Sequence, residues 1–323
     1  MAKQVVIAVG GNALGSAHTE QLKAAAETAA FVCDLLQEGC SVVITHGNGP
    51  QLGQVENIIN KIAAVNRKAA EIPFSARIAM TQAYIGGDIA NALREEMTRR
   101  GIKNRDVVSI ITEVLVDEND PAFAKPTKPI GEFMTKEAAE ELAQKTGITV
   151  MEDAGRGYRK VIASPKPQKI IRLDTICRAL DEGNVVITCG GAGIPVVKDE
   201  GSYRSVRAII DKDYVSALLA REINADCLVI LTGMEKVSIN YRKPNETELN
   251  AITADEAQSC INAGQFAAGS MLPKMEAAAE FARSANGRKT IITNIARAMD
   301  AFKGKTGTRI MKGTLSKGRY CLK

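Results

Sequence analysis

Residues 5–14 read Val-Val-Ile-Ala-Val-Gly-Gly-Asn-Ala-Leu, an unbroken apolar run that passes directly into two glycines. The pattern returns at 42–50, Val-Val-Ile-Thr-His-Gly-Asn-Gly-Pro, and at 185–193, Val-Val-Ile-Thr-Cys-Gly-Gly-Ala-Gly. In open α/β sheets, ligands bind beyond the carboxyl ends of strands, where glycine lets backbone N–H groups approach an anion closely. One such stretch alone would indicate only a tight turn. Three of them at equivalent strand ends predict a shared phosphate-binding edge.

Short apolar runs alternate with helical patterns along most of the chain. Buried strands that alternate with amphipathic helices predict an α/β fold with an open, mainly parallel sheet sandwiched between helices. The expected strands are 5–9, 42–45, 106–116, 184–189, 208–210, 227–231 and 290–293. The expected helices are 18–38, 50–63, 75–100, 173–182, 212–223 and 273–285.

The region 117–169 breaks this rhythm. It is rich in proline and contains two short strand candidates, 148–152 and 158–163, with a hairpin turn expected at Gly155–Gly157. We therefore expect a small, protruding, β-rich subdomain at about 117–170.

Composition excludes several classes of protein. The 323 residues are 45% hydrophobic and carry a formal net charge of +5, which is ordinary for a folded globular protein. The basic residues form no run of about five, so we expect no binding of nucleic acid. No apolar stretch approaches the roughly 18 residues that span a membrane. The seven cysteines form no Cys-x-x-Cys pair, which favours a reducing compartment, and we expect a cytoplasmic protein.

Three lysines stand where a bound phosphate would explain them. Lys212 and Lys274 both fall in the first turn of an expected helix, where a cation opposes the helix dipole. Asp211 and Asp213 flank the first of them and would offset that cost, Asp211 as an N-cap. Lys128 belongs to a loop stiffened by proline. For any single lysine, a side chain in solvent is the simpler interpretation. The alternative is that these ammonium groups face one phosphate.

Two better-known phosphate motifs do not fit. The chain has no Gly-x-x-x-x-Gly-Lys-Ser/Thr motif, so it is not a P-loop protein. Gly47, Gly49 and Gly53 are spaced one residue too widely for a dinucleotide-binding fingerprint. A nicotinamide-binding oxidoreductase therefore remains a weaker alternative.

Taken together, the motifs resemble those of carbamate kinases, members of the amino acid kinase superfamily. The first glycine stretch and Lys212-Asp213 indicate the superfamily, and the Lys-Pro-Ile-Gly and Gly-Ser-Met-Leu-Pro-Lys stretches narrow it to this family. The stretches that carry the resemblance are Val9–Leu14, Thr45–Gln51, Lys128–Gly131, Gly155–Gly157, Gly190–Pro195, Ile210–Asp213, Gly269–Lys274 and Gly304–Thr308.

The resemblance implies one domain of the amino acid kinase fold over 1–323, usually assembled as a homodimer. The N-terminal lobe, 1–205, would hold the phosphoryl acceptor and carry the protruding subdomain. The C-terminal lobe, 206–323, would bind the nucleotide. The implied reaction is reversible phosphoryl transfer between carbamoyl phosphate with ADP and carbamate with ATP, in the catabolic, ATP-forming direction. Mg²⁺ would arrive on the nucleotide, with no dedicated metal site. Whether arginine or purine breakdown supplies the carbamoyl phosphate stays open.

The resemblance also assigns residues to the site. The phosphoryl group in transfer would be bound by Lys128, Lys212 and Lys274, with Asp213 orienting the lysines. The carbamate and phosphoryl pocket would be lined by Gly10, Gly11, Asn12, Asn48 and Gly49. The nucleotide would be held by Thr232, Tyr241, Met271 and Lys274.

Three positions depart from the family pattern. Ala192 replaces a glycine, Met134 stands where an aromatic residue is usual, and Tyr158 stands where tryptophan is common. Carbamate is already a nucleophilic anion and needs no general base, so we expect His46 to orient the second glycine turn. Two further alternatives are another amino acid kinase with a different small carboxylate acceptor, and a nucleotide-binding regulator without catalysis.

Overall fold

The apolar run at the N-terminus forms strand β1 (Gln4–Val9), which lies inside an eight-stranded sheet between β12 (Cys227–Leu231) and β2 (Ser41–His46). The sheet order is β15-β17-β16-β12-β1-β2-β9-β3, and neighbours are parallel except that β17 runs antiparallel to β16. The predicted mainly parallel sheet is therefore confirmed. The other strands are β3 (Val107–Ser109), β9 (Val185–Ile187), β15 (Ala251–Thr253), β16 (Lys289–Thr293) and β17 (Thr308–Met311).

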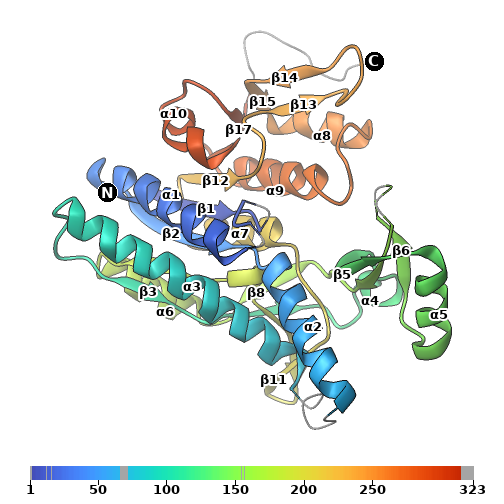
Figure 1. Cartoon of the computed structure of the whole chain (residues 1–323). Helices are drawn as coiled ribbons and strands as arrows, with labels where there is room; N and C mark the ends of the chain where they lie inside the picture. Colours follow the sequence, from blue (N-terminus) through green and yellow to red (C-terminus); the bar gives the residue numbers. More distant parts are fainter. Residues whose placement is uncertain are drawn as a thin grey trace.

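The computed structural model describes residues 2–11, 13–15, 17–65, 72–153, 155 and 157–313. Within these ranges, helices cover both faces of the main sheet (Figure 1), because β1 and its neighbours are apolar on both sides. Val5, Ile7 and Val9 share one core with α1 (His18–Gln37), α3 (Phe74–Arg99) and α10 (Ala298–Phe302). Val6 and Ala8 share the other core with α6 (Leu173–Asp181), α7 (Lys212–Glu222), α8 (Ala254–Asn262) and α9 (Met271–Arg283). None of the helices in the described ranges is at once long and apolar enough to cross a membrane.

Smaller sheets flank the main one. One of them has the strand order β11-β10-β4-β8. It consists of β4 (Glu113–Val116), β8 (Pro167–Ile170), β10 (Ile194–Asp199) and β11 (Ser202–Ser205). A hairpin pairs β13 (Val237–Ile239) with β14 (Thr247–Leu249). The antiparallel sheet β5-β7-β6 joins β5 (Lys128–Met134), β7 (Tyr158–Ile162) and β6 (Val150–Glu152). With α4 (Pro121–Ala124) and α5 (Lys136–Thr146), this last sheet forms the expected subdomain, which stands apart from the main body in Figure 1.

Two sequence predictions were wrong in part, and one helix was missed. The run 106–116 is not one strand, because the chain leaves the main sheet after β3 and enters a different sheet as β4. The segment 208–210 is not a strand and forms a single bridge between Ala208 and Ala163. Helix α5 was not predicted, although Thr135 caps its start and Gly147 ends it with φ 69°. The segment between these two caps is rich in the helix formers Ala and Glu, but the prolines on either side of it favoured an interpretation as strands and turns.

The first two glycine stretches meet at the carboxyl edge of the main sheet. The backbone N–H of Gly10 donates to the Leu231 carbonyl at 3.0 Å, and that of Gly47 donates to the Val9 carbonyl at 2.9 Å. A Cβ atom on Gly47 would lie 2.6 Å from the backbone nitrogen of Gly11. Only glycine permits this approach, so the two turns lie backbone against backbone.

The third stretch turns through the left-handed backbone region although two of its residues carry side chains. Cys189 has φ 51° and Ala192 has φ 72°. Such a conformation costs a non-glycine residue about 1–2 kcal/mol. Ala192 is completely buried, so the surrounding core holds a methyl group where glycine was expected.

His46 ends β2 and lies against the third turn, because a Cβ atom on Gly190 would collide with its ring. Its Nδ1 atom is 3.1 Å from the Gly47 carbonyl oxygen. A carbonyl only accepts hydrogen bonds, so Nδ1 carries the ring proton. Burial lowers the pKa of His46 from 6.5 to about 4, and the ring is neutral at pH 7. These contacts suit the predicted role of orienting the glycine turns.

We predict that His46 makes the fold sensitive to acid. Because the pKa in the folded chain is lowered, the unfolded chain binds a proton at this position first as the pH falls below 6.5. The free energy of unfolding should therefore fall by about 2 kcal/mol between pH 7 and pH 5 through His46 alone. Urea unfolding of the wild type and of His46→Asn at both pH values measures the effect. An equal loss in the two proteins would contradict the assignment.

Candidate active site

Helix α7 begins beside the glycine turns with three charged residues in a row. Asp211 is its N-cap, and the Asp211 side chain accepts a hydrogen bond from the backbone N–H of Asp213 at 3.0 Å. Lys212 is the first helical residue, so its cationic side chain starts at the positive end of the helix dipole. The Lys212 carbonyl oxygen accepts from Ser216 Oγ at 2.6 Å, and Ser216 meets Thr45 Oγ1 of β2 at 2.6 Å. The start of α7 is therefore tied to the sheet edge.

The carboxylate of Asp213 lies between two ammonium groups. Lys212 Nζ is 2.5 Å from Asp213 Oδ1, and Lys274 Nζ is 3.0 Å from Asp213 Oδ2. The Asp213 side chain is only 2% exposed, and those of Lys212 and Lys274 are 11% and 16% exposed. Burial alone would raise the pKa of Asp213, but the two cations hold it at about 2. Asp213 is thus ionised at every physiological pH and keeps both lysines in place.

The buried position of Lys212 also changes the pKa of its ammonium group. Burial lowers the pKa of Lys212, the Asp213 carboxylate opposes that shift, and neighbouring Lys274 adds to it. Lys274 belongs to α9, and its ammonium group also donates to the Ser270 carbonyl at 3.3 Å, just before the helix begins. Two cations therefore share one carboxylate, which leaves a net positive charge facing the adjoining space.

Lys128 reaches the same place from the subdomain. It is the first residue of β5, and its ammonium group forms an ion pair with the Asp211 carboxylate. The Lys128 side chain is 32% exposed, so it is the most accessible of the three lysines. Three cations from β5, α7 and α9 are thus gathered around two carboxylates.

All three lysines border one cavity of about 200 Å³ at the carboxyl edge of the sheet. The predicted residues that line it are Gly10, Gly11, Asn48, Gly49, Lys128, Lys212, Asp213, Thr232 and Lys274. The Asn48 amide is buried and donates to Thr81 Oγ1 at 2.8 Å, which holds its side chain in a fixed position in the cavity wall. Asn12, also predicted for this pocket, lies outside the described residues.

A second cavity, of about 260 Å³, adjoins the first and shares four lining residues with it: Thr232, Gly269, Ser270 and Lys274. It is lined by all four residues predicted for the nucleotide: Thr232, Tyr241, Met271 and Lys274. Phe266 and Met234 add apolar surface, and Ser238 and Gln265 add polar groups. A concave lining that is mostly apolar, with a few polar groups, is typical of sites for small molecules.

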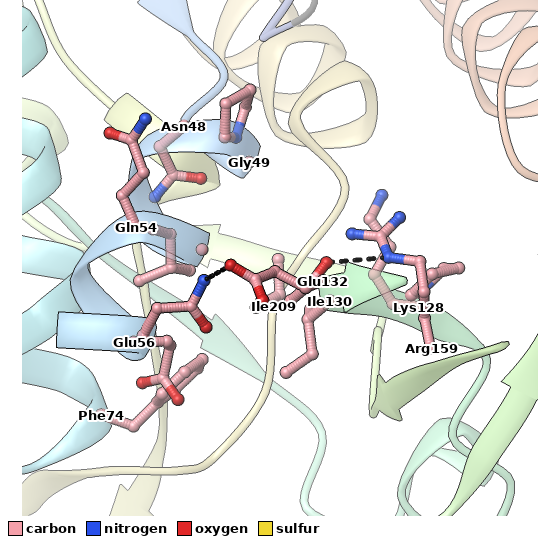
Figure 2. A pocket seen from close by; sticks show the side chains of 16 residues that line it. Asn48, Gly49, Gln54, Glu56, Phe74, Lys128, Ile130, Glu132, Arg159 and Ile209 are labelled. Carbon is pink, nitrogen blue, oxygen red and sulfur yellow. Dashed lines mark hydrogen bonds between the residues drawn. The ribbon is translucent and has the colours of Figure 1, made fainter. Parts of the chain in front are cut away.

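A third cavity, of about 420 Å³, opens between the subdomain and α2 (Gly49–Val65) (Figure 2). In Figure 2, Lys128 and Arg159 lie on the subdomain side and Asn48 and Gly49 on the opposite side. Glu132 of β5 spans the space and accepts a hydrogen bond from Asn57 of α2 at 2.7 Å. This cavity shares Lys128, Asn48 and Gly49 with the 200 Å³ cavity, so the two adjoin at Lys128.

Sequence reasoning missed part of this surface. Asp211 was expected only to cap a helix, yet it also pairs with Lys128. Glu132 and Arg159 were not singled out, because they come to line the same cavity only when β5 pairs with β7. Met134 and Tyr158, two of the departures from the family pattern, lie opposite each other in that same pair.

Within the described ranges, no cluster of three or more His, Cys, Asp or Glu side chains could hold a metal ion. At the 200 Å³ cavity, both carboxylates already have lysine partners.

Comparison with known proteins agrees with this geometry. Residues 3–294 match the model of the amino acid kinase family. The carbamate kinase-like protein YqeA of Escherichia coli is 50% identical over 310 residues, covering 96% of this chain and 99% of that protein. The carbamate kinase of Clostridium perfringens is 44% identical over 314 residues, covering 96% of this chain and all of its own length (100%).

A solved structure shows the same likeness. The carbamate kinase from Giardia lamblia bound to AMP-PNP superposes with a TM-score of 0.87 at 38% identity, covering 97% of this chain and 99% of that chain. The chain therefore belongs to the amino acid kinase family and, within it, to the carbamate kinases.

Proposed function

We propose that this protein is a carbamate kinase, which transfers a phosphoryl group reversibly between carbamoyl phosphate with ADP and carbamate with ATP. The observation that carries the proposal is the convergence of Lys128, Lys212 and Lys274 on one small cavity beside a larger, partly apolar one. Two of the named relatives are carbamate kinases, which supports the same reaction. The physiological direction that we propose is formation of ATP.

The reaction needs charge neutralisation and in-line placement more than covalent chemistry. Three ammonium groups would neutralise the oxygens of the phosphoryl group in transfer, each as a mobile point charge. Backbone N–H groups of the glycine turns, at Gly11 and Gly49, would supply fixed donors. Asp213 would keep Lys212 and Lys274 oriented throughout. Carbamate brings its own anionic oxygen, so no base is needed, and His46 stays neutral beneath the turns.

The nucleotide would occupy the 260 Å³ cavity, with its base near Tyr241 and Met271 and its phosphates beside Thr232 and Lys274. The AMP-PNP bound by the Giardia lamblia relative supports a nucleotide site in this fold. Mg²⁺ would come with the phosphates of ADP or ATP, since Asp211 and Asp213 are engaged by lysines. The ion would then neutralise phosphate charge without a cage of protein ligands.

We also propose a two-lobed organisation, with the acceptor in 1–205 and the nucleotide in 206–323, and a cytoplasmic location.

A homodimer is the assembly that the exposed surface favours. Ile58, Ile62 and Val65 follow one face of α2, and Met80 and Tyr84 follow one face of α3, all of them exposed. Apolar stripes of this kind on neighbouring helices are typical of protein interfaces, and two-fold dimers are the commonest assembly.

The reaction is tested by ATP formation from carbamoyl phosphate and ADP, followed with a coupled assay. We expect activity in the wild type and a fall in kcat of about 10²–10³ in Lys128→Ala, the usual scale for removing one transition-state charge partner. Lys136→Ala, an exposed lysine on α5, is the matched control and should keep wild-type turnover.

Other outcomes would support the alternatives. Phosphorylation of an amino acid carboxylate, with no ATP formed from carbamoyl phosphate, would indicate a different acceptor. Binding of ADP without turnover of any phosphoryl donor would indicate a regulator.

We predict that Tyr241→Ala weakens nucleotide binding. An aromatic ring stacked on a base contributes about 1–3 kcal/mol, so KM for ADP should rise about tenfold while kcat changes much less. Tyr203→Ala, an exposed tyrosine on β11, serves as the control. An unchanged KM for ADP would place the base elsewhere.

We predict that Ile62→Lys separates the homodimer. A charge placed in the apolar stripe would have to be desolvated in the interface, which the dimer does not tolerate without a partner. Light scattering coupled to gel filtration should give a dimer mass for the wild type and a monomer mass for the variant. Met151→Lys, on β6 of the subdomain, should remain dimeric. A monomeric wild type would refute the assembly.

A further inference from the structure

Asp211 has more contacts than a helix cap requires. One carboxylate oxygen, Oδ1, accepts from the backbone N–H of Asp213, and the other, Oδ2, pairs with the ammonium group of Lys128. Its side chain is 13% exposed and lines the 200 Å³ cavity. One side chain thus links the subdomain to the start of α7.

A carboxylate at this position has an electrostatic cost. It stands in the wall of a cavity that would hold a phosphoryl group, where like charges repel. Asparagine, serine or threonine would cap the helix about as well without that repulsion. The cap alone therefore does not account for the negative charge, and the ion pair with Lys128 does.

The backbone brings these two side chains together by a short route. Lys128 lies opposite Ile162 in the β5–β7 pair. The next residue, Ala163, bridges to Ala208, and the Ala163 carbonyl accepts from the Ile209 N–H at 2.9 Å. Asp211 follows two residues later. The main chain therefore fixes the backbone position of Lys128. Its side chain is long and partly exposed, so without a partner it would sample several rotamers.

We propose that Asp211 is a positioning residue, which holds the ammonium group of Lys128 at the wall of the phosphoryl cavity before substrate binds. This role rests on the proposed carbamate kinase reaction. The carboxylate uses one of the three donors of the ammonium group and leaves the others for phosphoryl oxygens. Asp211 restrains Lys128 as Asp213 restrains Lys212 and Lys274, so each lysine of the cavity has a carboxylate that fixes it.

The decisive variant is Asp211→Asn, which retains an N-cap oxygen and removes the charge. We expect kcat to fall about tenfold, because Lys128 is no longer held, while KM for carbamoyl phosphate stays the same or falls, because a repulsive charge is gone. The thermal midpoint should stay near that of the wild type. Asp120→Asn, which changes the N-cap carboxylate of α4, is the matched control and should leave kcat unchanged.

A double-mutant cycle separates positioning from a general structural effect. In a Lys128→Ala background, Asp211→Asn should cause no further loss of kcat, because the residue through which it acts is absent. An equal tenfold loss in that background would overturn the proposal, and so would wild-type kcat in Asp211→Asn.

A second measurement does not depend on the reaction. Acetic anhydride labelling of the folded protein, followed by mass spectrometry of its peptides, reports the reactivity of each lysine. Asp211→Asn should label faster than the wild type at Lys128 and equally at Lys136. If the wild type forms no ATP while Lys128 still responds in this way, the proposed reaction fails and the positioning contact stands. Unchanged labelling of Lys128 would refute the contact itself.

Discussion

The site depends on the burial of one negative charge between two positive ones. Asp213 is almost inaccessible, and Lys212 and Lys274 approach its two oxygens from different helices. An unpaired ion at that depth would be costly, so the three groups stabilise one another only as a set. The set is left with one surplus positive charge, directed at a small cavity walled by backbone of the glycine turns. The same arrangement that makes the charges tolerable thus also gives the cavity the positive charge that the proposed anion site requires.

The parts of the fold set by local pattern were predictable from the sequence. The apolar run of β1 and the long amphipathic α1 and α3 fall within one or two residues of their expected ends. Residues 106–116 show the limit, since an apolar, strand-like run does not reveal that its two halves join different sheets. Ala208–Ile210 is apolar because it packs in the core beside the subdomain, and burial alone made it resemble a strand.

For the candidate site, the sequence indicated which residues gather at one cavity but not how they pair. Lys212 and Lys274 were conspicuous because a cation opposes the dipole at a helix start, and their gathering on one cavity agrees with that signal. The contact between Lys128 and Asp211 joins residues 83 positions apart. It depends on a strand pair and a single backbone bridge, and neither leaves a trace in residue spacing. Glu132 and Arg159 escaped notice for the same reason.

The lysines that border the cavity come from β5, α7 and α9, which meet only when the sheet and the subdomain are formed. The unfolded chain therefore has no comparable cluster of cations, and a ligand that fills the cavity binds the native state alone. By mass action, each tenfold excess of such a ligand over its dissociation constant adds about 1.4 kcal/mol to the free energy of unfolding. Resistance to heat and to proteolysis in the cell would then follow the supply of phosphorylated metabolites.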